Sequence, residues 1–90
     1  MNIQRKIVVR GKVQGVGFRN ATWRKAIELG IRGSVRNLDD GSMEILASAT
    51  DKEFKVFDNW CSEGPSHARV DRLEISELDQ AGFTDFSIDD

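Results

Sequence analysis

Several residue types that build common protein sites are scarce in this sequence. Its 90 residues include one cysteine, one histidine and one proline, and there is no tyrosine. A single cysteine, Cys61, forms no disulfide within the chain, which makes the sequence compatible with a reducing compartment. A single histidine, His67, excludes a histidine-rich metal site. We therefore expect a protein without a disulfide framework and without a histidine-rich metal site. No cofactor is expected either.

Long apolar runs and a strong charge of one sign are missing as well. No apolar run approaches the roughly 20 residues of a membrane-spanning helix, and residues 1–10 lack the apolar core of a signal peptide. The net charge of −2 does not favour nucleic acid as a partner. We therefore expect a cytoplasmic protein with no membrane and no nucleic-acid partner, in which any anion is bound by a local site.

Length and composition favour one soluble globular domain. Hydrophobic residues make up 39% of the chain and charged residues 31%, which argues against disorder. A chain of 90 residues is long enough for one compact core and no more. Since no linker or low-complexity segment interrupts the pattern, we assign residues 1–90 to a single domain.

The spacing of apolar residues predicts five strands and two helices. In chain order, the expected elements are a strand at 3–13, a helix at 18–30, strands at 33–38 and 43–49, a helix at 50–64, a strand at 70–78 and a short strand at 86–88. Asp40-Gly41 marks a hairpin turn, and the spacing of Thr50 and Glu53 marks a capping box at the start of the second helix. A change of parity between Val70 and Leu73 predicts a bulge or a bend.

This order is the split β-α-β-β-α-β, or ferredoxin-like, pattern with an additional terminal strand. We expect an α+β fold in which two helices cover one face of an antiparallel sheet. The predicted apolar faces consist of Phe18, Thr22, Trp23, Ala26, Ile27 and Leu29 in the first helix, and of Phe54, Val56, Phe57, Trp60 and Cys61 in the second. On this pattern we interpret both tryptophans and the cysteine as core residues, not as a binding platform and a nucleophile.

The segment between the first strand and the first helix carries the strongest chemical signal. It reads Gly11-Lys12-Val13-Gln14-Gly15-Val16-Gly17-Phe18-Arg19. Gly15 and Gly17 permit backbone conformations that turn successive N–H groups towards one point. The helix that follows adds unpaired N–H groups and the positive end of its dipole. The segment predicts a cradle for a phosphate-sized anion, although it matches neither a Walker loop nor a dinucleotide fingerprint.

Two polar residues stand on or near faces that the pattern predicts to be apolar. The planar guanidinium of Arg19 suits phosphate oxygens above the loop; the alternative is a solvated arginine at a frayed helix start. Asn37 shares strand parity with Val35, and its amide could position a water and donate to an oxyanion; the alternative is an ordinary turn residue. His67 could serve as a general base, but its place in a loop favours a surface role.

The motif at 11–19 closely resembles the phosphate-binding signature of the acylphosphatase family. A second motif, Gly33-Ser34-Val35-Arg36-Asn37, resembles the second signature of that family, and the resemblance extends from Ile7 to Ile88. Residues that differ from those common in the family, none of them at a catalytic position, are Asn20, Ser34 and Leu38.

This resemblance implies a monomeric, ferredoxin-like enzyme that hydrolyses acyl phosphates to a carboxylate and inorganic phosphate, without a metal or a covalent intermediate. It implies that Arg19 clamps the phosphate and that Asn37 orients the attacking water. The segment implied to hold the phosphate, mainly through backbone N–H groups, consists of Gln14, Gly15, Val16, Gly17, Phe18 and Arg19.

Two rival functions belong to other classes. A non-catalytic, phosphate- or anion-binding regulatory module would need the loop and Arg19, but it has no use for an inward Asn37. A single-stranded RNA binder on the same topology needs exposed aromatic residues on its central strands, which the sequence does not provide. The resemblance therefore favours the enzyme.

Overall fold

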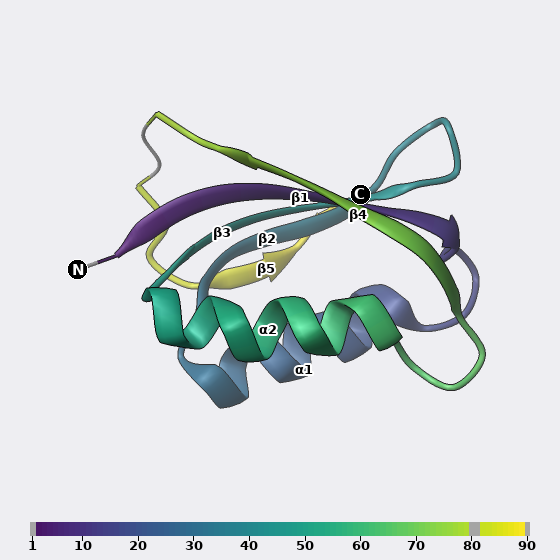
Figure 1. The fold of residues 1–90 in the computed structure, drawn as a ribbon, viewed down its shortest axis with the longest axis horizontal. Coiled ribbons are helices and arrows are strands. Elements are labelled where there is room, and N and C mark those ends of the chain that lie inside the picture. Colours follow the sequence, from purple (N-terminus) through teal and green to yellow (C-terminus); the bar gives the residue numbers. More distant parts are fainter. Residues whose placement is uncertain (1, 80–81, 90) are drawn as a thin grey trace.

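The computed structural model describes residues 2–79 and 82–89 of the chain (Figure 1). Its elements, in chain order, are β1 (Ile3–Lys12), α1 (Phe18–Leu29), β2 (Arg32–Asn37), β3 (Met43–Ala49), α2 (Asp51–Glu63), β4 (Arg69–Glu77) and β5 (Phe86–Ile88). Every element expected from the sequence is present, with its boundaries shifted by no more than one residue. The ferredoxin-like order of strands and helices is therefore confirmed.

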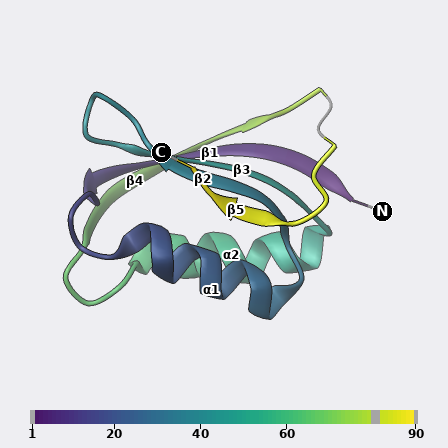
Figure 2. The same cartoon turned by 180° about the vertical axis from the view of Figure 1, so that it is seen from behind.

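The strands form one sheet in the order β4-β1-β3-β2-β5, and both helices lie on the same face of it (Figure 1, Figure 2). Neighbouring strands among β1 to β4 run antiparallel, whereas β5 pairs parallel with β2. The sheet is therefore mixed, and the expected antiparallel arrangement holds only for its first four strands.

The chain path explains the parallel strand. Leu78, just after β4, donates its N–H to Gln4 O over 3.1 Å, so β4 ends beside the start of β1. β2 begins at this same end of the sheet, because Ser48 stands opposite both Gln4 and Arg32. A strand that starts from this end and runs along β2 must be parallel to it, as Figure 1 shows for β5.

The core lies between the sheet and the two helices. One cluster of buried apolar side chains fills this space and consists of Ile7, Val9, Val13, Phe18, Ala26, Ile31, Val35, Met43, Ile45, Ala47, Ala49, Phe54, Phe57, Cys61 and Phe86. Along β1, alternate residues enter the cluster, as the period of a strand requires. Cys61 has no exposed surface, which confirms its prediction as a core residue.

Three apolar residues that the sequence predicted to face the core are exposed instead. They are Trp23, Ile27 and Val56, with 38%, 52% and 47% of their surface accessible. The buried stripe of α1 is narrower than predicted and consists of Phe18, Thr22 and Ala26. Because each residue turns a helix by 100°, Ile27 is carried round to the solvent side, and Val56 lies opposite Phe54 on α2. The predicted apolar faces were therefore too wide.

Two local signals in the sequence are confirmed. Thr50 Oγ1 accepts from Glu53 N–H over 3.2 Å, and Glu53 Oε1 accepts from Thr50 N–H over 2.8 Å, which completes the capping box of α2. The pairing of β1 with β4 shifts register beside Gly11, with Asp71 as the extra residue of the predicted bulge. Across the described residues, no helix is long and apolar enough to cross a membrane.

Candidate active site

The loop between β1 and α1 folds around two glycines in the left-handed conformation. Gly15 has a φ of 73° and Gly17 a φ of 78°, values that residues with a side chain rarely adopt. A Cβ placed on either residue meets no atom within 4 Å. The backbone conformation, rather than crowding, therefore requires glycine at these positions, and the space above the loop is open to a ligand.

The N-terminus of α1 faces the same loop. Its first backbone hydrogen bond runs from Ala21 N–H to Gly17 O over 3.1 Å, so the N–H groups of the first turn stand ahead of the helical ladder. The first turn holds no acidic residue, and Gly17 supplies no side-chain cap. The positive end of the helix dipole is therefore not offset by a carboxylate in its own first turn, which suits a bound anion.

A pocket of about 310 Å³ lies beside this loop. Its lining residues come from the loop after β1, from α1, β2 and β5, and they are Val13, Gly15, Gly17, Phe18, Arg19, Asn20, Asn37 and Ile88. The fold thus brings Arg19 and Asn37, which the sequence singled out on separate elements, to one space beside the glycine loop. Within the described part of the chain, Gln14 and Val16 are candidate site residues that do not line it.

Arg19 is the second residue of α1, and its partly buried side chain lines the pocket. The helix is regular from Phe18 onwards, so Arg19 does not stand on a frayed end. Its place at the first turn puts the guanidinium within the region where the loop and the helix dipole favour negative charge. A planar guanidinium at this position can bind two oxygens of one phosphate.

Asn37 is the last residue of β2, and its side chain is partly buried. Val35, two residues earlier, is fully buried, so Asn37 continues the core-facing row of β2 towards the pocket. The amide oxygen Oδ1 of Asn37 is buried and has no hydrogen-bond donor among the described residues. Since buried polar atoms in proteins are nearly always paired, this oxygen is suited to accept a hydrogen bond from a molecule in the pocket.

The side chain of Gln14 forms hydrogen bonds with another part of the protein, whereas its backbone N–H is expected to bind the phosphate. Its amide Nε2 donates to Leu38 O over 2.7 Å and to Ser42 O over 2.9 Å. These two hydrogen bonds, hereafter the Gln14 bridge, join the start of the loop to the β2–β3 hairpin. The side-chain nitrogen is therefore committed to the protein, and the backbone N–H of Gln14 remains for a ligand.

The tip of the same hairpin is held by Asp40. Its carboxylate accepts hydrogen bonds from the hydroxyl and, over 2.9 Å, the N–H of Ser42, and it pairs with the Arg10 guanidinium over 3.1 Å. These donors, the Ser42 hydroxyl first, lower the pKa of Asp40 to about 2. The carboxylate therefore stays ionised well below neutral pH, and the hairpin beside Asn37 keeps its tether.

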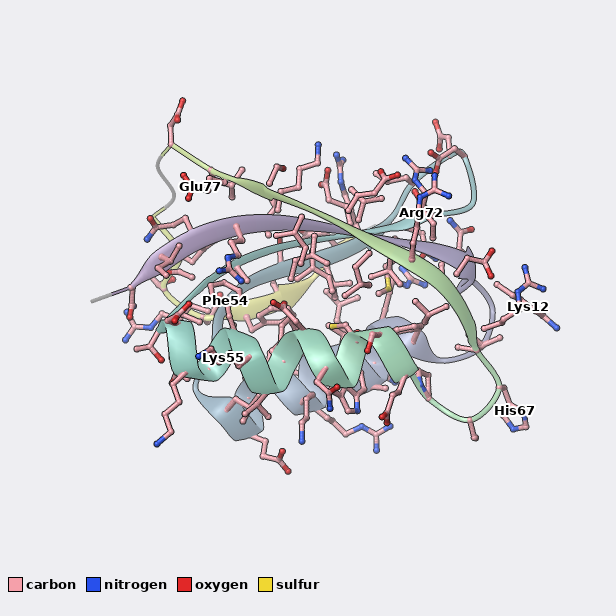
Figure 3. All side chains as sticks on the ribbon, in the orientation of Figure 1. Lys12, Phe54, Lys55, His67, Arg72 and Glu77 are labelled. Carbon is pink, nitrogen blue, oxygen red and sulfur yellow. The ribbon has the colours of Figure 1, made fainter. Side chains whose placement is uncertain are left out.

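Neither the histidine nor the cysteine belongs to the pocket. His67 is exposed in the loop between α2 and β4, and Figure 3 shows it pointing away from the fold. Burial strongly raises the pKa of the Cys61 thiol, which keeps it protonated and unreactive. Over residues 2–79 and 82–89, no three His, Cys, Asp or Glu side chains gather into a group that could hold a metal ion.

Apart from Val13, which lies within the motif at 11–19, two lining residues escaped the sequence analysis. Ile88 reaches the pocket because β5 pairs parallel with β2, with Val35 opposite Ile88. No local signal predicts that pairing, since it joins strands that are distant in the chain. Asn20 follows Arg19 in the first turn of α1. Its position next to Arg19 was the only feature of the sequence that could have indicated a place in the pocket.

Known proteins share both the sequence pattern and the fold. The sequence model of the Acylphosphatase family matches residues 5–88. An acylphosphatase of Mannheimia succiniciproducens is 46% identical over 86 residues, which are 96% of this chain and 93% of that protein. Solved acylphosphatase structures from Coxiella burnetii and Bacillus subtilis have TM-scores of 0.92 and 0.91 at 33% and 35% identity, covering 98% of this chain and 93% and 98% of theirs. Since sequence and structure agree over nearly its whole length, the chain belongs to the acylphosphatase family.

Proposed function

We propose that this chain hydrolyses the carboxyl-phosphate bond of acyl phosphates by direct attack of a water molecule that Asn37 holds. Membership of the acylphosphatase family supports acyl phosphate hydrolysis in general. The observation that carries the finer proposal is the buried, unpaired amide oxygen of Asn37 in the same pocket as the glycine loop. An anion-binding loop alone explains phosphate binding, but an inward acceptor beside it is what a nucleophilic water needs.

The loop and Arg19 bind the phosphate in this proposal. Backbone N–H groups from Gln14 to Phe18 donate to the phosphoryl oxygens, and the dipole of α1 adds to the positive field. Arg19 binds two oxygens of the same group and neutralises the charge that builds on them in the transition state. The proposal needs no metal, because these groups supply the positive charge themselves.

Asn37 positions the nucleophile. Its Oδ1 accepts one proton of the water in a hydrogen bond, which points an oxygen lone pair at phosphorus, in line with the bond to the acyl oxygen. A new P–O bond forms as the bond to the acyl oxygen breaks, and the carboxylate leaves with its electron pair. Because a carboxylate is a weak base, no protein acid is required, and the proton of the water passes to a phosphate oxygen.

The direct test is hydrolysis of benzoyl phosphate by the purified protein in the presence of EDTA. Turnover to benzoate and phosphate, inhibited competitively by added inorganic phosphate, would support the proposed reaction. Folded protein that binds phosphate without any turnover would overturn it and favour the non-catalytic anion-binding module. From the resemblance to the acylphosphatase family we further propose that the chain acts as a monomer, in the cytoplasm.

The mechanism also predicts that His67 takes no part in proton transfer. His67→Ala should leave kcat/KM and its dependence on pH between about 5 and 8 unchanged, because the side chain is exposed outside the pocket. The measurement is a pH–rate profile of wild type and variant with benzoyl phosphate. A group that titrates near neutrality in the wild type and disappears in the variant would assign His67 the role of general base.

A further inference from the structure

The Gln14 bridge joins two parts of the site that are distant in the chain. Gln14 directly precedes Gly15 of the phosphate-binding loop, and Leu38 directly follows Asn37. Its amide nitrogen has two protons, and the two accepting carbonyls lie at 2.7 and 2.9 Å, so each proton has its own acceptor. One side chain therefore connects the loop proposed to bind the phosphate to the backbone beside Asn37, the residue proposed to hold the water.

The accepting carbonyls are those that close the hairpin. Leu38 N–H donates to Ser42 O over 2.9 Å, and Gly41 N–H donates to Leu38 O over 3.2 Å. The Gln14 bridge adds a second donor to each of these oxygens, which fills both of their lone pairs. The base of the hairpin at 38–42 is thus fixed from within the turn and from the loop at the same time, while Asp40 and Arg10 tether its tip.

The orientation of the Asn37 side chain depends on the Gln14 bridge, because the amide oxygen of Asn37 is not held by a hydrogen bond from any described residue. Its Oδ1 has no hydrogen-bond donor in the described structure, so no side-chain contact of that oxygen sets its direction. The backbone at the end of β2 must set it instead. Pairing with Met43 holds this backbone on the side of β3, and the Gln14 bridge holds the next residue on the side of the loop.

We infer that Gln14 is a positioning residue, whose side chain sets the distance between the phosphate-binding loop and Asn37. This inference rests on the proposed function, since it assigns Asn37 to the attacking water and the loop to the phosphate. Gln14 itself touches neither reacting atom through its side chain, and it acts on the reaction through Asn37.

Gln14→Met tests the inference, because methionine keeps the length of the side chain and removes both donors. We expect kcat for benzoyl phosphate to fall by about 10- to 100-fold, the effect of displacing an aligned group by a fraction of an ångström. The inhibition constant of inorganic phosphate should stay within about twofold, because the loop backbone and Arg19 still bind it. An equal loss of phosphate affinity and kcat would overturn the inference, since Gln14 would then support the loop alone.

The chain offers a matched control at the opposite end of β1. Gln4 Nε2 donates to Ser48 Oγ over 3.1 Å, so Gln4→Met also removes a partly buried amide hydrogen bond. The control lies roughly 30 Å from the site along the strand. It should leave kcat unchanged even where it lowers stability as much as Gln14→Met. A similar fall in kcat in both variants would show a general effect on stability and contradict positioning.

A double-mutant cycle distinguishes a failure of the inference about Gln14 from a failure of the proposed role of Asn37. In an Asn37→Ala background, Gln14→Met should lower kcat no further, because there is no longer an amide to position. Independent, multiplied effects would overturn the inference while leaving Asn37 in its proposed role. If Asn37→Ala alone keeps full activity, the proposed role of Asn37 in holding the water is contradicted. The single variant shows this independently of the result for Gln14→Met. Should Gln14→Met not fold, Gln14→Asn, which is too short to reach both carbonyls, replaces it in the same cycle.

Discussion

Replacing Arg19 by alanine is expected to lower kcat/KM for benzoyl phosphate by about 10³-fold or more, the range seen when an arginine is removed from phosphoryl transfer. The side chain lines the pocket at the first turn of α1 and lies outside the hydrophobic core. Its loss should therefore spare the fold and remove the only guanidinium among the lining residues. Initial rates with EDTA present, together with circular dichroism of the variant, measure both effects.

Two further arginine variants show whether charge or geometry matters. Arg19→Lys keeps the positive charge but not the planar fork, so we expect activity between those of wild type and Arg19→Ala. Arg24→Ala removes an exposed arginine of the same helix that does not line this pocket, and it should retain full activity. An Arg19→Ala variant as active as Arg24→Ala would contradict the proposed clamp, and would leave the loop N–H groups as the sole phosphate ligands.

Most of the fold could be predicted because its signals are local. Asp40-Gly41 strongly favours a hairpin turn, and the reciprocal bonds of Thr50 and Glu53 start α2 within a single turn. The bulge at Asp71 was visible as a change of parity along one strand. Each of these features depends on residues that are neighbours in the chain, so a sequence reader needs no knowledge of what packs against them.

The errors concern contacts between distant segments. How wide a stripe a helix buries depends on its distance and tilt against the sheet, which explains why Ile27 and Val56 were wrongly assigned to the core. The parallel pairing of β5 depends on which end of the sheet the chain reaches after β4. The width of the buried helix face and the pairing of β5 both depend on how the helices and the sheet pack together. The periodicity of apolar residues along a single element therefore cannot predict them.

The site residues likewise differ in whether their signal is local in the chain. Loop glycines and Arg19 could be found from the sequence, because the loop and the helix start that make an anion cradle are consecutive in the chain. Asn37 was ambiguous between an inward amide and a turn residue, and only the assembled structure gives it a buried oxygen without a donor. The Gln14 bridge and the wall formed by Ile88 had no signal in the sequence at all.

Replacing Asn37 by alanine carries the second large expected effect, a fall in kcat of about 10²- to 10³-fold, comparable to the loss of one preorganised hydrogen-bonding group from an active site. The amide makes no hydrogen bond through Oδ1 to the described protein, so its removal should cost little stability. Inorganic phosphate should inhibit the variant as strongly as it inhibits wild type, because the loop and Arg19 are intact. Steady-state rates and the inhibition constant of phosphate therefore separate the role of Asn37 from that of Arg19.

The isosteric variant Asn37→Asp makes the assignment sharper. A carboxylate still accepts a hydrogen bond from water, but its negative charge repels the phosphate of the substrate. We expect Asn37→Asp to lose both kcat and phosphate affinity, whereas Asn37→Ala loses kcat alone. Asn59→Ala, at an exposed position on α2, is the control and should match wild type. If Asn37→Ala instead weakens phosphate inhibition in proportion to its loss of rate, the amide binds the phosphate, and the attacking water must be held by another group.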